Sequence, residues 1–210
     1  MLGSWLLAVA VMGCVAAGQT SSPHAPSAKP AVWQRHCQLE GGFCFKYPGS
    51  WSVLGEIFAG HGVVVAPPQK EDKALWDAIT VALVVPAPEG DQEPLGLDGV
   101  IAQATSGLRE TGQDFETVQR QQRTVDAKPA ELLKVRYREK SSGRDWIEEM
   151  VFIEGPDNEI YSVALKCSPQ SLARLEPLFS QVVGSWTLPE PEPSPNAGED
   201  APAKPKTAPH

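Results

Sequence analysis

The chain has 210 residues and a formal net charge of −8 at pH 7. Phosphate binding needs clustered Lys and Arg, so this acidic balance argues against nucleic acid and anionic membrane surfaces as partners. With the two ends set aside, about 155 residues remain, which is the size of one hydrophobic core. We therefore predict a single globular domain over residues 32–188.

An apolar run from Trp5 to Ala17 opens the chain. As a helix it would span about 20 Å, which is too short for the hydrocarbon core of a membrane, about 30 Å thick. It contains a lipobox-like tetrapeptide, VMGC, that ends at Cys14. We predict a signal peptide over residues 1–17 with lipid attachment at Cys14 as the only membrane anchor. Cleavage after Ala17 would instead give a secreted or periplasmic product, and a buried helix of a cytosolic protein is the third interpretation.

Two segments have compositions that favour disorder. Residues 18–31 are rich in Ser, Pro and Ala, and residues 189–210 repeat Pro with Glu and Lys. Such segments have too little apolar surface to offset the entropy lost on ordering. The sequence predicts a disordered tether before the domain and a disordered Pro-rich tail after it.

The first half of the domain is dominated by strand patterns. We predict strands at Phe43–Tyr47, at Trp51–Val53 after a Pro-Gly turn, and at Gly62–Ala66 before two prolines. The near-continuous apolar run Ile79–Val85 is typical of a central strand with both faces covered.

A meander is predicted in the second half. Leu132–Arg138 and Trp146–Ile153 are expected to pair across a turn, and Glu159–Cys167 adds a third strand. Phe115–Thr124 is rich in Gln and Arg, which favours an edge position. Basic residues alternate along the segment around Lys134, and this spacing predicts a solvated outer face, with an anion-binding patch as the alternative.

Two helices are expected to interrupt the strands. Asp98 is a candidate N-cap for the first, which Gly112 ends. The second is predicted to begin with Pro169 at its first position and to end at Gly184, with a kink or restart at Pro177. The segment 185–188 then returns as a terminal strand. This order of elements predicts an α+β fold with an antiparallel sheet.

Three cysteines would remain after lipidation of Cys14: Cys37, Cys44 and Cys167. Cys37 and Cys44 flank the turn sequence LEGG and would face each other in a hairpin, so a disulfide between them is predicted in an oxidising compartment. A bridge from either one to Cys167 is the alternative. Without a CxxC spacing, and with only His36 nearby, no metal site is predicted.

The segment from Gly42 to Trp51, GFCFKYPGSW, resembles the opening of domains in the PsbP and Mog superfamily. Phe43, Phe45 and Tyr47 occupy the aromatic positions, and the similarity of layout extends over most of residues 40–188. The resemblance implies an α-β-α sandwich on a central antiparallel sheet. Members of this superfamily include exported bacterial lipoproteins, an extrinsic photosystem II subunit and a Ran-binding nuclear-transport factor. Because they share a scaffold for docking and no reaction, the resemblance implies no catalytic residues and no cofactor.

Few residues stand out as candidates for chemistry. His61 lies between two glycines in a predicted loop, and Glu148 and Glu149 are adjacent on a strand, so they point to opposite faces. A thiol-imidazole pair between Cys167 and His36 is less favoured than a buried or bonded cysteine. Trp76 is the tryptophan most expected to be exposed, and an exposed Trp would mark a docking surface.

The predicted function is therefore a non-enzymatic interaction domain in the cell envelope that binds another envelope protein. An envelope enzyme of hydrolase type, with a cleft centred on His61, is one alternative. A scaffolding subunit of an envelope or photosystem-type complex is the other. The sequence leaves the partner and the oligomeric state open.

Overall fold

An antiparallel sheet of seven strands forms the centre of the computed structural model, which describes residues 32–68, 77–86 and 93–189. Its strand order is β3-β4-β5-β9-β8-β7-β6. A separate hairpin precedes it, made of β1 (Trp33–Gln38) and β2 (Phe43–Pro48). The sheet strands are β3 (Ser52–Ile57), β4 (Gly62–Ala66), β5 (Ala78–Val85), β6 (Gly112–Val125), β7 (Lys128–Glu139), β8 (Asp145–Glu154) and β9 (Ile160–Cys167).

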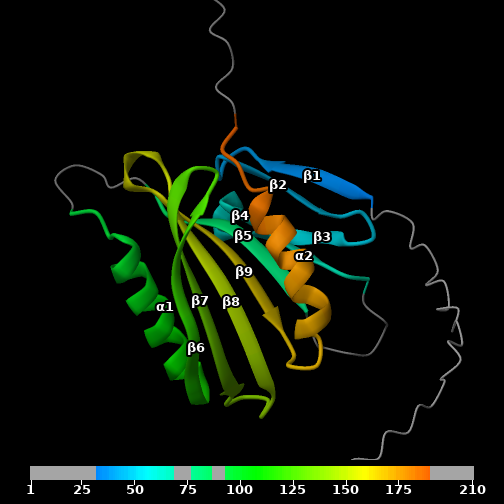
Figure 1. Cartoon of the computed structure of the whole chain (residues 1–210), viewed down its shortest axis with the longest axis vertical. Coiled ribbons are helices and arrows are strands. Elements are labelled where there is room, and N and C mark those ends of the chain that lie inside the picture. Colours follow the sequence, from blue (N-terminus) through cyan, green and yellow to red (C-terminus); the bar gives the residue numbers. More distant parts are fainter. Residues whose placement is uncertain (1–31, 69–76, 87–92, 190–210) are drawn as a thin grey trace, which may run out of the picture. The chain divides into compact units, whose positions relative to one another are not determined.

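Two helices cover the sheet from opposite sides (Figure 1). Helix α1 (Leu97–Thr111) places Val100 and Ile101 on the face formed by side chains such as Val135. Helix α2 (Leu172–Gly184) covers the other face together with β2. The larger core lies on this second face, between the sheet, α2 and β2. It includes Phe43, Phe45, Val63, Val65, Val151, Val163, Leu165, Leu175, Phe179, Val182 and Trp186. The predicted α+β fold, an α-β-α sandwich on an antiparallel sheet, is confirmed.

The strand pairing follows the sequence patterns closely. β7 pairs with β8 and β8 with β9, which is the predicted meander. β5 lies between β4 and β9, as expected for a central strand; Ile79, Val81 and Leu83 are buried on one face and Ala82 on the other. Among the described strands, β6 pairs with β7 alone, at the predicted edge of the sheet.

The helix starts differ from the prediction. The N-cap of α1 is Gly96, and Asp98 lies in the first turn, where the helix dipole favours a negative charge. Helix α2 begins at Leu172, because Pro169 belongs to the turn that precedes it. The helix continues past Pro177 as one element and ends at Gly184 as predicted. In the part of the chain that the structure describes, no helix is long and apolar enough to cross a membrane.

The segment after α2 is not the strand that the sequence predicts. Thr187 forms one isolated bridge with Cys44, in which the Cys44 amide donates to the Thr187 carbonyl at 2.8 Å and the Thr187 amide donates back at 2.9 Å. Trp186 is buried in the core beside this bridge. The segment therefore closes the domain by attaching to β2, outside the sheet.

The basic stripe on β7 is not a solvated outer face at Lys134. This side chain is buried under α2, where its Nζ lies 2.7 Å from Glu176 Oε1 and 3.3 Å from Glu149 Oε2. The alternation along β7 is as predicted, but α2 covers the face that carries Lys134. Farther along the same strand, Arg136 pairs with Glu116, and Arg138 Nε lies 3.0 Å from Asp145 Oδ1.

Candidate functional site

The outer edge of β3 has no hydrogen-bonded neighbour among the described residues. Five of its six residues are exposed, and the sixth, Ile57, is half-buried. Val53 and Leu54 are 41% and 43% exposed, so two apolar side chains lie on an open edge. The sequence predicts a strand here. β3 and β4 form a local hairpin, and β3 is at the edge because β4 pairs with β5 on its other side.

The 3-10 turn η1 (Phe58–Gly60) follows β3 and carries the most unusual backbone of this region. Phe58 and Ala59 both adopt left-handed conformations, with φ of 52° and 53°, and Gly60 has φ of 94°. A bulky residue rarely adopts this conformation, which costs on the order of 1 kcal/mol or more. Despite this unusual backbone, Phe58 is 61% exposed, so most of its surface faces solvent.

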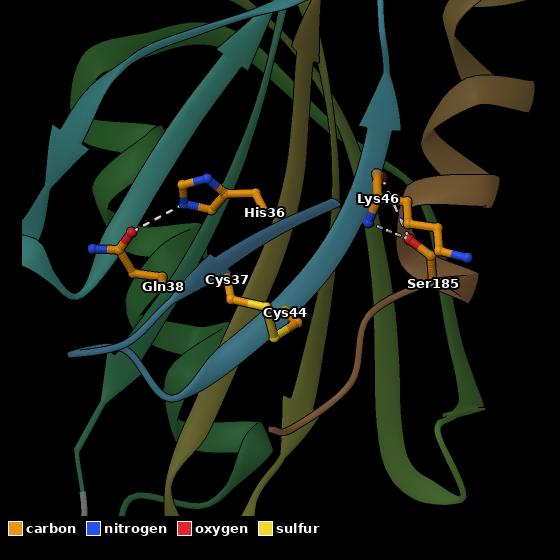
Figure 2. Close-up of a disulfide and its surroundings, with 6 residues drawn as sticks. All are labelled: His36, Cys37, Gln38, Cys44, Lys46 and Ser185. Atoms are coloured by element: carbon orange, nitrogen blue, oxygen red, sulfur yellow. Dashed lines mark hydrogen bonds between the residues drawn. A yellow bond between two sulfur atoms is a disulfide. The ribbon is translucent and has the colours of Figure 1, made fainter. Parts of the chain in front are cut away.

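The β1–β2 hairpin holds η1 in place. The Gln38 side-chain amide donates to the Gly60 carbonyl at 2.5 Å, and the Gln38 Oε1 lies 3.1 Å from His36 Nε2. Figure 2 shows this pair on β1, beside the disulfide between Cys37 and Cys44. These cysteines are direct partners in the strand register, and their sulfurs are 2.11 Å apart.

The other end of the hairpin is fixed to the body of the domain. The backbone amide of Lys46 donates to Ser185 Oγ at 2.8 Å, just after the end of α2 (Figure 2). The hairpin is thus bonded both to α2 and to η1. The turn between its strands also presents Leu39, which is 86% exposed. We call the exposed apolar residues Leu39, Val53, Leu54 and Phe58 the apolar rim.

Two carboxylates flank the apolar rim near Gly60. Glu56 on β3 accepts a hydrogen bond from the Gln38 amide at 3.4 Å. The Glu40 carboxylate lies directly against Gly60, so a Cβ at this position would have to displace it. Both side chains are exposed, and no Lys or Arg within the described ranges forms an ion pair with either. The apolar rim therefore has two carboxylates, Glu40 and Glu56, at the end that lies beside η1.

His61 lies at the same end of β3, in an exposed position. Its ring Nδ1 is 3.1 Å from the backbone carbonyl of Glu40. Among the described residues, no carboxylate is hydrogen-bonded to this ring. Within the described ranges, the structure therefore shows no acid that orients the His61 imidazole for general-base chemistry.

The remaining candidates are separated from the rim. Cys167 is a buried free thiol of the core, and burial raises its pKa to about 12. Glu148 accepts a hydrogen bond from the Tyr137 hydroxyl, whereas Glu149 faces Lys134, so the two glutamates lie on opposite faces as predicted. Cys14, the tether 18–31, Trp76 and the tail beyond Pro189 lie outside the described residues.

A second exposed region, at the far end of β7, does not suit an anion. It is a cleft of about 460 Å³ whose lining includes the charged residues Arg136, Arg138 and Asp145. Both arginines already face a carboxylate partner, Glu116 and Asp145 respectively. Since paired guanidinium groups offer little net positive charge, the anion-binding alternative for this stripe gains no support.

No protein-family model and no curated protein match this sequence. The solved structures that resemble it include the cyanobacterial PsbP protein, CyanoP, from Synechocystis sp. PCC 6803, with a TM-score of 0.56 and 15% identity over 80% of this chain and 99% of that one. A mutant of the protein Mog1 gives a TM-score of 0.51 and 12% identity, covering 75% of this chain and 96% of Mog1. The described domain therefore has the fold of the PsbP and Mog superfamily, as the segment from Gly42 to Trp51 indicates.

Proposed function

We propose that this chain is an exported cell-envelope protein, lipid-anchored at Cys14, whose PsbP/Mog-type domain binds another envelope protein without catalysing a reaction. The VMGC sequence supports the anchor. The disulfide between Cys37 and Cys44 supports an oxidising compartment, because such bonds persist outside the reducing cytosol. Membrane contact is made by the lipid alone, and the partner is a protein.

One observation carries the binding role: the open edge of β3 leads into a strained turn whose Phe58 faces solvent. Natural proteins usually protect sheet edges with charges, prolines or covering elements. Strained backbone persists where surrounding structure holds it, and it is concentrated at functional sites. Exposed aromatic and aliphatic side chains on such a rigid support are typical of binding surfaces.

Site-specific photo-crosslinking in the cell tests this role. A photoreactive residue replaces Leu54 in one variant and Val118 in the control variant. Val118 is an exposed apolar residue on β6, the opposite edge strand. We expect one envelope protein to be crosslinked from position 54 and not from position 118, and Leu54→Asp to abolish its co-purification while Val118→Asp retains it. Equal crosslinking from both positions would contradict the proposal.

The anchor and the alternatives have separate tests. The intact mass of the membrane-bound form is expected to correspond to a chain that begins at Cys14 and carries acyl groups. A soluble form beginning at Gly18 would contradict the lipid anchor. An activity lost on His61→Ala with the fold intact would favour the enzyme alternative, and co-purification in fixed stoichiometry would favour a scaffolding subunit.

A further inference from the structure

We infer that the β3 edge binds its partner as an added strand, and that the bound segment carries a Lys or Arg for Glu40 and Glu56. This inference rests on the proposed function and specifies the chemistry of the partner. It joins three features of the described residues: a strand edge with no paired strand, an apolar rim with two residues on β3 and two in the turns next to its end, and two carboxylates near Gly60.

The backbone of β3 favours a strand over a helix as the occupant. A strand of six residues is about 20 Å long, and at an edge roughly half of its amides and carbonyls point away from the sheet. An extended segment satisfies these groups in the way that β4 satisfies the inner ones, whereas a helix has no free backbone groups to offer along its length. The exposed sides of β3 then give room for side chains of the added strand.

Comparison of the two edges of the sheet singles out β3. The opposite edge strand, β6, has 14 residues, two register irregularities and long charged side chains such as Arg120 and Arg123. These are the features that prevent edge-to-edge pairing. β3 has one bulge, between Val53 and Gly55, and regular register over Gly55–Ile57. The bulge limits the length of pairing, so β3 fits a short segment and not an extended second sheet.

The charge at the η1 end specifies a cation. The Glu40 carboxylate lies against Gly60, and Glu56 accepts a hydrogen bond from the Gln38 amide, which also donates to the Gly60 carbonyl. Among the described residues, no Lys or Arg forms an ion pair with either carboxylate. Two unpaired carboxylates next to an apolar edge repel an acidic segment and attract a basic one. The partner segment is therefore extended and apolar, with a basic residue at the end that lies beside η1.

The test uses the mature protein and three synthetic peptides with capped ends. The first alternates Val and Thr over seven residues and ends in Lys. In the second, Glu replaces Lys. The third is the Lys peptide with alternate backbone amides methylated, which removes the donors of one edge. Affinity and the site of binding are measured by amide chemical shifts in NMR titrations.

We expect the Lys peptide to shift amides of β3 and η1 and not those of β6, and methylation to weaken binding at least tenfold. The Glu peptide is expected to bind about fivefold more weakly, as one or two exposed ion pairs imply. In the double variant Glu40→Gln/Glu56→Gln, the Lys and Glu peptides are expected to differ in affinity by less than about twofold. Such a result would show that the two carboxylates cause the preference for Lys.

Three results would overturn the inference: no binding of the Lys peptide, equal binding of the methylated peptide, or shifts centred on β6. Dimerisation of the protein through β3 in the absence of peptide would do the same, since a second copy would then be the occupant. If position 54 crosslinks a partner but methylation has no effect, the proposed function stands and strand addition fails. If the peptide binds β3 but no envelope protein is crosslinked, the proposed function fails instead.

Discussion

Replacing Lys134 by Met tests how α2 is held on the sheet. The Lys134 and Glu149 side chains are 11% and 7% exposed, and Glu176 on α2 is 46% exposed. Burial lowers the pKa of Lys134, but the Glu176 and Glu149 carboxylates outweigh it and hold that pKa above its usual value. Met has a similar volume and no charge, so Lys134→Met leaves the Glu149 carboxylate buried without its cation. We expect a loss of about 3 kcal/mol in the free energy of unfolding at pH 7.

The loss depends on pH in a defined direction. Burial raises the pKa of Glu149, and Lys134 opposes that rise. Without Lys134 the pKa of Glu149 rises further. A buried carboxyl with a raised pKa does not destabilise the folded state while it is protonated, below its unfolded pKa of about 4.3. As pH rises through the folded pKa the carboxyl becomes charged, and the free energy of unfolding falls. The penalty of Lys134→Met is therefore expected to be largest at pH 7 and to fall by at least half at pH 4.5.

Urea unfolding of four proteins at both pH values measures this effect: the natural chain, Lys134→Met, Glu149→Gln and the double variant. Because the double variant removes the buried charge together with its partner, we expect it to recover at least half of the stability lost in Lys134→Met. A loss below about 0.5 kcal/mol at pH 7, the range of ordinary surface substitutions, would refute the reasoning. So would an equal loss at pH 7 and pH 4.5.

Three further predictions concern single positions. Gly60→Ala is expected to lower the free energy of unfolding by about 2 kcal/mol, because φ is 94° and a Cβ would also have to displace the Glu40 carboxylate. Gly143→Ala, with φ of 68° in open space, measures the backbone cost without a contact, and equal losses in thermal unfolding would show that the Glu40 contact is unimportant. Replacing Cys37 and Cys44 by Ser is expected to destabilise the domain by about 2.5 kcal/mol for a separation of seven residues, and an unchanged melting temperature would contradict this. Cys167, whose pKa is raised to about 12 by burial, is expected to resist alkylation at pH 8 until urea unfolds the chain; fast labelling of the folded protein, measured by mass spectrometry, would oppose its placement in the core.

Local signals in the sequence predict most of the sheet. The turn between Cys37 and Cys44 sets their register, and the structure pairs these residues directly. The polar content of β6 indicates its edge position, because such residues are unfavourable in a covered strand. The helix starts were predicted less well, since Asp98 and Pro169 are each compatible with several positions near a helix N-terminus.

The candidate site depends on contacts between distant segments, and for that reason it was missed. Nothing around Val53 and Leu54 shows that β3 would have a neighbour on one side only, since that depends on the pairing of β4 with β5. The burial of Lys134 likewise depends on α2, 42 residues away. The sequence signal for the rim was weak: two adjacent apolar residues, Val53 and Leu54, directly before Gly55. Trp76, the predicted docking residue, lies outside the described residues.

Hydrogen exchange of the two edge strands tests the central claim most directly. Backbone amides of β3 and β6 are compared between the purified mature protein and the same protein in isolated envelope membranes. If β3 is the docking edge, exchange of its amides slows in the membranes by at least tenfold, while that of β6 stays unchanged. Unchanged exchange in β3, or equal slowing in both strands, would contradict the account.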